Sequence, residues 1–217
     1  MWSWLGVGML GCLASALLSP VASFSVSRLI DRSERVLSHW GIHLIRMGLV
    51  IGFIVIHGTT DNHMERMTGW FFLFCLAVAT VTDVCFRLIP DRLTVTAGIL
   101  FMSGRLIWGE EPPQLYFMGF LFGGGLLWSV AWFSQGGMGG GDVKLAALAG
   151  WALGWPDIAV GMALSVFIGG MAALLLWITR RVRMGTSLPF GPFLAVGMGV
   201  AWIAGERILN WYLSFFP

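Results

Sequence analysis

Charged residues are scarce in this chain, and their scarcity argues against a soluble protein. Asp, Glu, Lys and Arg make up 11% of its 217 residues, whereas hydrophobic residues make up 57%. Soluble domains contain about 25% charged residues, and the mean hydropathy here is +0.82. The net charge of +2 is not gathered into a basic patch with interleaved aromatic residues, so we expect no nucleic-acid partner. The composition predicts a protein that lies within the lipid bilayer.

Cysteine and histidine are too few and too scattered to predict a metal site. The three cysteines, Cys12, Cys75 and Cys85, form no CxxC motif, so we expect buried free thiols rather than a zinc or dithiol site. The four histidines lie in the first third of the chain: His39, His43, His57 and His63. Their spacing matches no zinc pattern. We expect no metal and no cofactor, and a histidine metal site is the weaker alternative.

Long apolar runs, in contrast, are abundant. A helix needs roughly 20 apolar residues to cross the hydrocarbon core. Eight runs are candidate spans, and the short ones are expected to extend into flanking polar residues: Trp2–Ser25, Ile42–His57, Gly69–Thr82, Leu93–Trp108, Leu115–Phe133, Val143–Gly154, Ile158–Thr179 and Phe190–Phe216. The first run is interpreted as a retained span rather than a signal peptide. We predict an all-α fold, a polytopic membrane helix bundle with about eight transmembrane helices and a single domain over residues 1–217.

The basic residues predict how this bundle is oriented. Cytoplasmic loops carry an excess of Lys and Arg. If the N-terminus lies outside, most basic residues fall on inner segments such as Ser27–Trp40 and Arg180–Ser187, and the outer loops carry only Arg66. Arg105 and Arg207 lie toward outer span ends, and we expect them to snorkel to the interface. Both termini are predicted to face outward.

Two acids stand where apolar spans end or begin. Asp83 ends the third span and Asp142 opens the sixth, and an acid beside lipid is costly and usually functional. Two spans separate these acids, so both are expected at the inner face at matching depth. Two carboxylates that share a site cannot easily both ionise, so one proton is held between them. The ionised member takes a proton from water and the neutral member polarises a scissile carbonyl, which predicts a hydrolytic pair.

Two further charged residues lie close to these acids in the sequence. Asp91 follows Pro90 and precedes the fourth span, so its side chain is expected to cap that helix. Lys144 lies two residues after Asp142 and therefore on a different helix face. It serves either as an interfacial anchor or as a residue that tunes the charge of the site.

Glycine and proline are concentrated near the acids. The glycines of residues 136–141 give room for irregular backbone, and Pro189 and Pro192 interrupt the last span. Irregular backbone at membrane depth is tolerated where it lines a cavity. One hypothesis is that unpaired backbone groups here bind an extended substrate in a strand-like manner. The alternative is that the glycines form a tight turn and the prolines only cap a helix.

Three segments resemble the type IV prepilin peptidases, bacterial members of the GxGD aspartic protease group. Asp83–Thr94 reads D-V-C-F-R-L-I-P-D-R-L-T, and in the family the first catalytic Asp also stands eight residues before the Asp of a Pro-Asp pair. Gly139–Leu145 reads G-G-G-D-V-K-L, in which Asp142 matches the GxGD aspartate. Pro189–Leu194 reads P-F-G-P-F-L and is similar to a segment at the start of the family's last helix. Order and spacing agree over about residues 70–200.

The resemblance implies an aspartic endopeptidase of the bacterial inner membrane. It would remove leader peptides from prepilins or pseudopilins on the cytoplasmic side, with pilus or secretion assembly machinery as further partners. Asp83 and Asp142 would be catalytic, and six residues would shape the site or bind substrate: Gly139, Gly141, Lys144, Pro189, Gly191 and Pro192. Larger relatives carry paired CxxC motifs after the first helix and also N-methylate the new terminus. Ser27–Trp40 has no cysteine, so we expect a short form without methyltransferase activity.

Two other classes remain as alternatives. Intramembrane acids and glycine-broken helices also occur in small proton- or ion-coupled transporters. However, no internal repeat is apparent, and one acid pair on one face does not describe a pathway across the membrane. A non-catalytic membrane scaffold is the third interpretation, and the presence of both aspartates argues against it.

Overall fold

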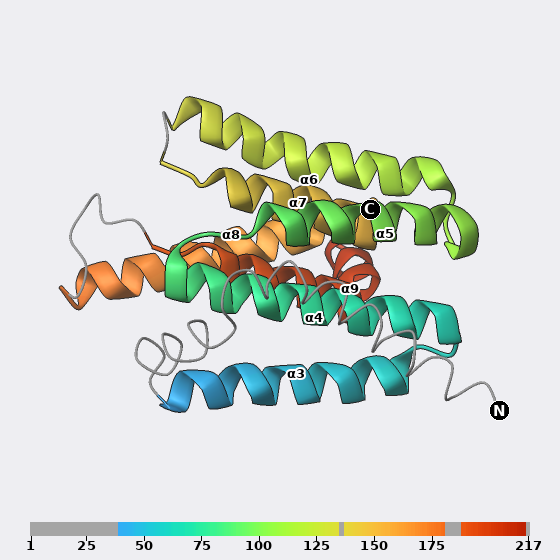
Figure 1. Cartoon of the computed structure of the whole chain (residues 1–217), viewed down its shortest axis with the longest axis horizontal. Coiled ribbons are helices and arrows are strands. Elements are labelled where there is room, and N and C mark those ends of the chain that lie inside the picture. Colours follow the sequence, from blue (N-terminus) through green and yellow to red (C-terminus); the bar gives the residue numbers. More distant parts are fainter. Residues whose placement is uncertain (1–38, 135–136, 181–187, 216–217) are drawn as a thin grey trace.

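The computed structural model describes residues 39–134, 137–180 and 188–215, and in these ranges it is helical throughout, without strands. The helices are α3 (His39–Thr59), α4 (His63–Phe86), α5 (Asp91–Trp108), α6 (Pro113–Phe133), α7 (Gly140–Leu153), α8 (Asp157–Ile178) and α9 (Gly191–Leu213). They form one bundle (Figure 1), which confirms the predicted all-α fold. The predicted span Trp2–Ser25, the thiol of Cys12 and most of the segments Ser27–Trp40 and Arg180–Ser187 lie outside the described residues.

Seven of the predicted spans correspond to these helices, with differences at their ends. The predicted span Gly69–Thr82 extends at both ends to form α4, which includes Glu65 in its first turn. The side chain of Asn62 caps this helix, because its Oδ1 accepts the Met64 N–H at 3.0 Å. The short helices do extend into polar residues, as predicted.

The outer surface of the bundle is suited to lipid. Large apolar side chains are exposed along several helices, including Ile54 at 66%, Phe133 at 83% and Phe167 at 66%. Of the helices in the described ranges, four are long and apolar enough to cross a membrane, namely α4, α6, α8 and α9. The chain therefore folds as a polytopic membrane helix bundle, and the number of about eight spans stays a prediction.

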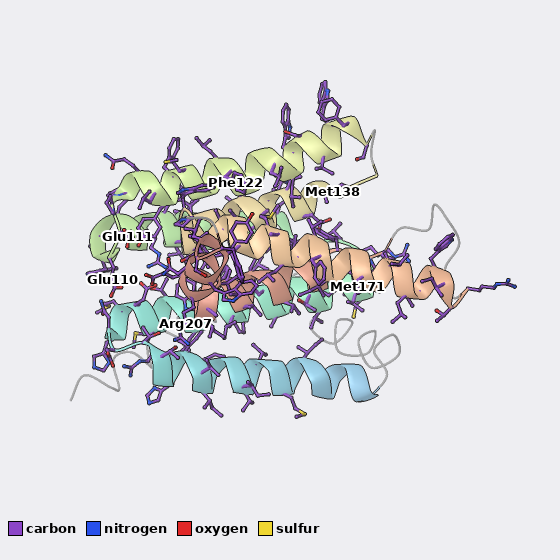
Figure 2. All side chains as sticks on the ribbon, turned by 180° about the vertical axis from the view of Figure 1, so that it is seen from behind. Glu110, Glu111, Phe122, Met138, Met171 and Arg207 are labelled. Atoms are coloured by element: carbon purple, nitrogen blue, oxygen red, sulfur yellow. The ribbon has the colours of Figure 1, made fainter. Side chains whose placement is uncertain are left out.

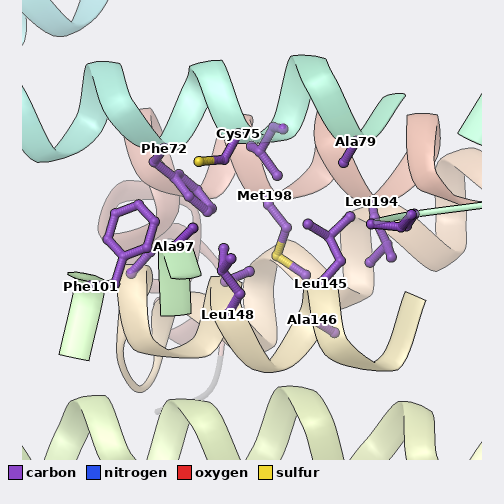
Figure 3. Close-up of a cluster of buried hydrophobic side chains, with 14 of the residues drawn as sticks. Phe72, Cys75, Ala79, Ala97, Phe101, Leu145, Ala146, Leu148, Leu194 and Met198 are labelled. Carbon is purple, nitrogen blue, oxygen red and sulfur yellow. The ribbon is translucent and has the colours of Figure 1, made fainter. Parts of the chain in front are cut away.

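The core lies between α4, α5, α7 and α9. Figure 3 shows Phe72 of α4, Phe101 of α5, Leu145 of α7 and Met198 of α9 converging, and each is at most 2% exposed. Helix α7 has only 14 residues, yet it packs against α5, α6 and α9. Cys75 and Cys85 are buried and form no disulfide with each other, so both are buried thiols, as predicted for them.

The prediction that Arg105 snorkels to the interface is wrong. Its side chain is 5% exposed and forms an ion pair with Glu65 of α4. Its Nε donates to the carbonyl of Ala152 at 3.0 Å, and its guanidinium lies 4.8 Å from the ring centre of Tyr116 and 5.1 Å from that of Trp202. The carboxylate and the carbonyl satisfy the guanidinium inside the bundle, so it has no need to reach the interface.

Different residues and helix termini lie at the two ends of the bundle. Figure 2 shows Glu110, Glu111 and Arg207 at one end, where the Nδ2 of Asn62 also donates to Glu110 at 2.8 Å. Because neighbouring helices run antiparallel, the opposite end collects the last turn of α4 and the first turns of α5, α7 and α9. Both predicted acids lie at this opposite end.

Candidate active site

The structure brings the two predicted acids together. Asp83 lies in the last turn of α4 and Asp142 in the first turn of α7. Asp83 is 7% exposed and Asp142 is 8% exposed, and the two carboxyl groups interact electrostatically. The ion pairs found among the described residues include neither of these acids, and a pair of buried acids is an unusual arrangement for a purely structural role.

The backbone of α9 holds the Asp83 carboxyl group. The N–H of Gly191 donates to Oδ2 of Asp83 at 2.8 Å, and Gly191 begins the helix, with Pro192 in its first turn. A Cβ atom at position 191 would lie 2.8 Å from the same Oδ2, so only glycine allows this approach. Pro189 lies just before the helix, in non-helical chain. The Gly191 N–H is therefore occupied by Asp83 and is not free to pair with a substrate.

Asp142 is less well satisfied than Asp83. Its Oδ1 is buried and has no hydrogen-bond partner among the described residues. The backbone of Gly139, which precedes α7 as its N-cap, lies beside the carboxyl group. Leaving a buried polar atom unpaired costs about 1–3 kcal/mol. This oxygen thus has hydrogen-bonding capacity that the described residues leave unused.

Arg87 is a charged neighbour of the pair that the sequence analysis did not single out. It ends α4 in the left-handed region (φ 52°, ψ 38°), and its N–H donates to the Asp83 carbonyl at 2.8 Å. Its guanidinium interacts electrostatically with the Asp83 carboxyl group. The signal was available in the sequence, because residues four apart lie on the same face of a helix.

The predicted capping role of Asp91 is wrong. Pro90 occupies the N-cap position of α5, and no side chain caps that helix. Asp91 is the first helical residue instead, and its Oδ1 accepts the Nζ of Lys144 at 2.6 Å. Lys144 is exposed whereas Asp142 is buried, so the prediction that they lie on different faces of α7 is confirmed. The ion pair with Lys144 on α7 draws the Asp91 carboxylate away from the N-terminal end of α5, so this carboxylate does not cap the helix.

The connection between α4 and α5 packs against the start of α7. Ile89 in this connection is 4% exposed, and a Cβ atom added to Gly141 would lie 3.0 Å from the Cβ of Ile89. This contact joins the segment that follows Asp83 to the residue that precedes Asp142. It therefore contributes to how the two acid-bearing helices lie relative to each other.

The histidines that the structure describes do not cluster. Nη1 of Arg66 lies 3.5 Å from Nδ1 of His57, whose ring stacks on that of Trp70. In the described part of the chain, no three His, Cys, Asp or Glu residues are grouped in a way that could hold a metal ion. The side chains of His39 and His43 lie outside the described residues, and the expectation of no metal stays a prediction.

These features define a helical membrane protein with a buried acid pair at one end of its bundle, and comparison with known proteins gives the family. Residues 70–174 match the model of the Type IV leader peptidase family. The chain is 32% identical to a relative from Bacillus subtilis (strain 168) over 151 residues, which cover 70% of this chain and 61% of the relative. It is 34% identical to one from Aeromonas salmonicida (strain A449) over 169 residues, 74% of this chain and 57% of the relative.

A third relative, from Pseudomonas aeruginosa, is 36% identical over 145 residues, 64% of this chain and 50% of the relative. All three relatives are named prepilin leader peptidase/N-methyltransferase. The predicted resemblance to this family is confirmed by the match of residues 70–174 and by the names of these relatives. The chain spans between half and about three-fifths of the length of these relatives. No solved structure matches it.

Proposed function

We propose that this protein is an intramembrane aspartic endopeptidase that removes the leader peptide of type IV prepilins or pseudopilins. The observation that carries the proposal is the buried pair of Asp83 and Asp142, with one carboxyl oxygen of Asp142 left without a hydrogen-bond partner among the described residues. The family match supports a peptidase, and the names of the relatives support a prepilin as substrate. The enzyme would lie in the bacterial inner membrane, with its site facing the cytoplasm.

The contacts of the two acids suggest different roles in the hydrolysis. The Gly191 N–H and the Arg87 guanidinium both favour the carboxylate form of Asp83. Asp83 therefore takes a proton from water, whose oxygen attacks the scissile carbonyl carbon. Asp142 gives its proton to the carbonyl oxygen, which forms a neutral tetrahedral diol. When the C–N bond breaks, Asp83 returns its proton to the departing amine and Asp142 recovers one from a hydroxyl group.

The remaining predicted site residues shape the surroundings of the pair. Gly139 is the N-cap of α7 beside the Asp142 carboxyl group, and Gly141 lets the start of α7 pack closely against Ile89. Pro189 and Pro192 set where α9 begins, and this start directs the Gly191 N–H at Asp83. Lys144 ties the first turn of α7 to α5 through Asp91. We assign these residues to positioning rather than to proton transfer.

Replacing each acid by its amide tests the proposal. Asp83→Asn and Asp142→Asn should each reduce leader removal to background while the protein remains folded and inserted, because either change removes an ionisable carboxyl group. Asp91→Asn is the matched control, and it should retain most activity because an exposed ion pair is worth about 0–1 kcal/mol. The measurement is mass spectrometry of a prepilin incubated with purified protein, with thermal unfolding as the folding check. Near wild-type turnover in either pair variant would refute the assignment of that acid, whereas no cleavage by the folded wild-type protein would favour the transporter alternative.

A further inference from the structure

A groove opens on the lipid-facing surface between α5 and α6. Both helices pack on α7 but contact each other little, so α7 forms the floor of the groove. Its volume is about 530 Å³, which falls in the usual range for ligand clefts, about 300–1,000 Å³. We call this feature the α5–α6 groove, and its boundaries include Val95, Ile99, Leu121, Trp128, Ala147 and Trp151.

Charge is confined to one end of the α5–α6 groove. Lys144 is the charged residue of the lining, and it is paired with Asp91. The walls are large apolar side chains that are more than half exposed, such as Ile99 at 56%, Leu121 at 53% and Trp128 at 58%. An occupant that complements this pattern is apolar along most of its length and becomes polar at the end that reaches Lys144.

Two glycines leave room in this groove for an occupant. A Cβ atom on Gly98 of α5 or on Gly125 of α6 would meet no heavy atom within 4 Å. Close packing within the bundle therefore does not explain why these two positions are glycine. Helices associate in membranes where small residues let another backbone approach. The open glycines fit a neighbouring helix better than they fit internal packing.

The groove leads to the acid pair around the start of α7. Lys144 lines the groove, whereas Asp142, two residues earlier, lies on the buried face of the same helix. Between the two faces runs the first turn of α7, where Gly140 is exposed and a Cβ atom added to it would meet nothing within 4 Å. An extended segment that leaves the groove at Lys144 can cross this bare turn and reach Asp142.

We infer that the α5–α6 groove binds the apolar helix of the protein substrate, and that the scissile segment crosses the first turn of α7 to the acids. The inference rests on the proposed function, since it names where the substrate of that reaction docks. The open glycines, which suit a helix backbone, and the position of Lys144 two residues after Asp142 favour the substrate helix over two other occupants, a lipid acyl chain and a second copy of this chain. Those two occupants are distinguished by experiment.

Filling the groove should impair cleavage of a substrate that carries its helix. Gly98→Leu and Gly125→Leu place a side chain in open space, so they fill the groove without a clash in the bundle. Gly170→Leu on α8 is the matched control, because this glycine is likewise exposed with nothing within 4 Å. Two substrates are compared, a full prepilin and a short peptide that spans the cleavage site without the apolar helix.

The ratio of kcat/KM for the full prepilin to that for the short peptide should fall by roughly tenfold or more in both groove variants. The ratio should stay at its wild-type value in Gly170→Leu. An unchanged ratio in the groove variants would overturn the inference, and so would an equal fall in the control. If the wild-type protein cleaved neither substrate, the proposed function itself would fail.

A cross-linking measurement reports on the groove independently of catalysis. Asp142→Asn is combined with Gly125→Cys or Gly170→Cys, and the prepilin carries one cysteine in its apolar helix. A disulfide to the substrate should form at position 125 and not at 170. Equal yields at both positions would overturn the inference and indicate a lipid-filled groove. Disulfides between two copies of the protein at position 125 would overturn it in favour of a dimer.

Discussion

Replacing Gly191 by Ala tests whether the backbone of α9 positions the Asp83 carboxyl group. The added Cβ atom would lie 2.8 Å from Oδ2, 3.0 Å from Cβ and 3.1 Å from Cγ of Asp83. Carbon atoms rest about 3.5–4.0 Å apart, so the side chain or the start of α9 must move by about 0.5 Å. Either movement lengthens or breaks the hydrogen bond between the Gly191 N–H and Oδ2.

The size of the effect follows from these contacts. A hydrogen bond to a charged group contributes about 1.5–3 kcal/mol, and a misplacement of 1 Å at a reacting group costs about 100-fold in rate. A displacement of half that size should lower kcat for leader removal by roughly 10- to 100-fold. KM should change less, because the Gly191 N–H is bonded to Asp83 and is therefore not free to bind the substrate.

Two comparison variants make the measurement specific. Gly139→Ala adds a Cβ atom at 3.4 Å from Oδ2 of Asp142, an ordinary contact distance, and its loss of activity should be at least about tenfold smaller. Gly170→Ala, in open space on α8, controls for the added methyl group. Leader removal is followed by mass spectrometry in detergent or proteoliposomes, with thermal unfolding as the folding check. Wild-type kcat in a folded Gly191→Ala protein would refute the positioning argument.

Three further predictions concern stability, orientation and chemistry. Arg105→Met should lower the free energy of unfolding by about 3–5 kcal/mol because it leaves the Glu65 carboxylate uncompensated inside the bundle; a loss no larger than that of the exposed Arg207→Met would contradict this. Cysteines at Glu110 and Arg92 should react with impermeant thiol reagents from opposite sides of the membrane, and equal reaction from one side would refute the alternating orientation. The enzyme should remove leaders without N-methylating the product, and a chelator should not affect cleavage, since no metal enters the mechanism. An N-methylated product made with S-adenosylmethionine, or chelator inhibition, would disprove the last prediction.

The features that the sequence predicts well depend on short stretches of chain. The lengths of the apolar runs locate the helices, and the number of runs between Asp83 and Asp142 predicts that both acids lie at the same end of the bundle. Arg87 belongs to this group as well, because its position four residues after Asp83 implies a shared helix face. That relation was predictable, although it was not predicted.

The features that the sequence does not predict depend on pairings between distant residues. Glu65 and Arg105 are 40 residues apart, and their ion pair decides that the arginine is buried. Asp91 and Lys144 are 53 residues apart, so a helix cap was the natural but incorrect expectation for Asp91. Local propensity carries no information on which helices become neighbours, and these contacts follow only from the packed bundle.

The hydrogen bond from Gly191 to Asp83 also bears on when the proposed peptidase would become active during its synthesis. It joins residues that lie 108 positions apart, so the two acids are translated and inserted well before the backbone group that orients one of them. A nascent chain that ends before α9 carries both aspartates but lacks their full alignment. Proteolytic competence is thus expected to arise only after the last described helix has inserted.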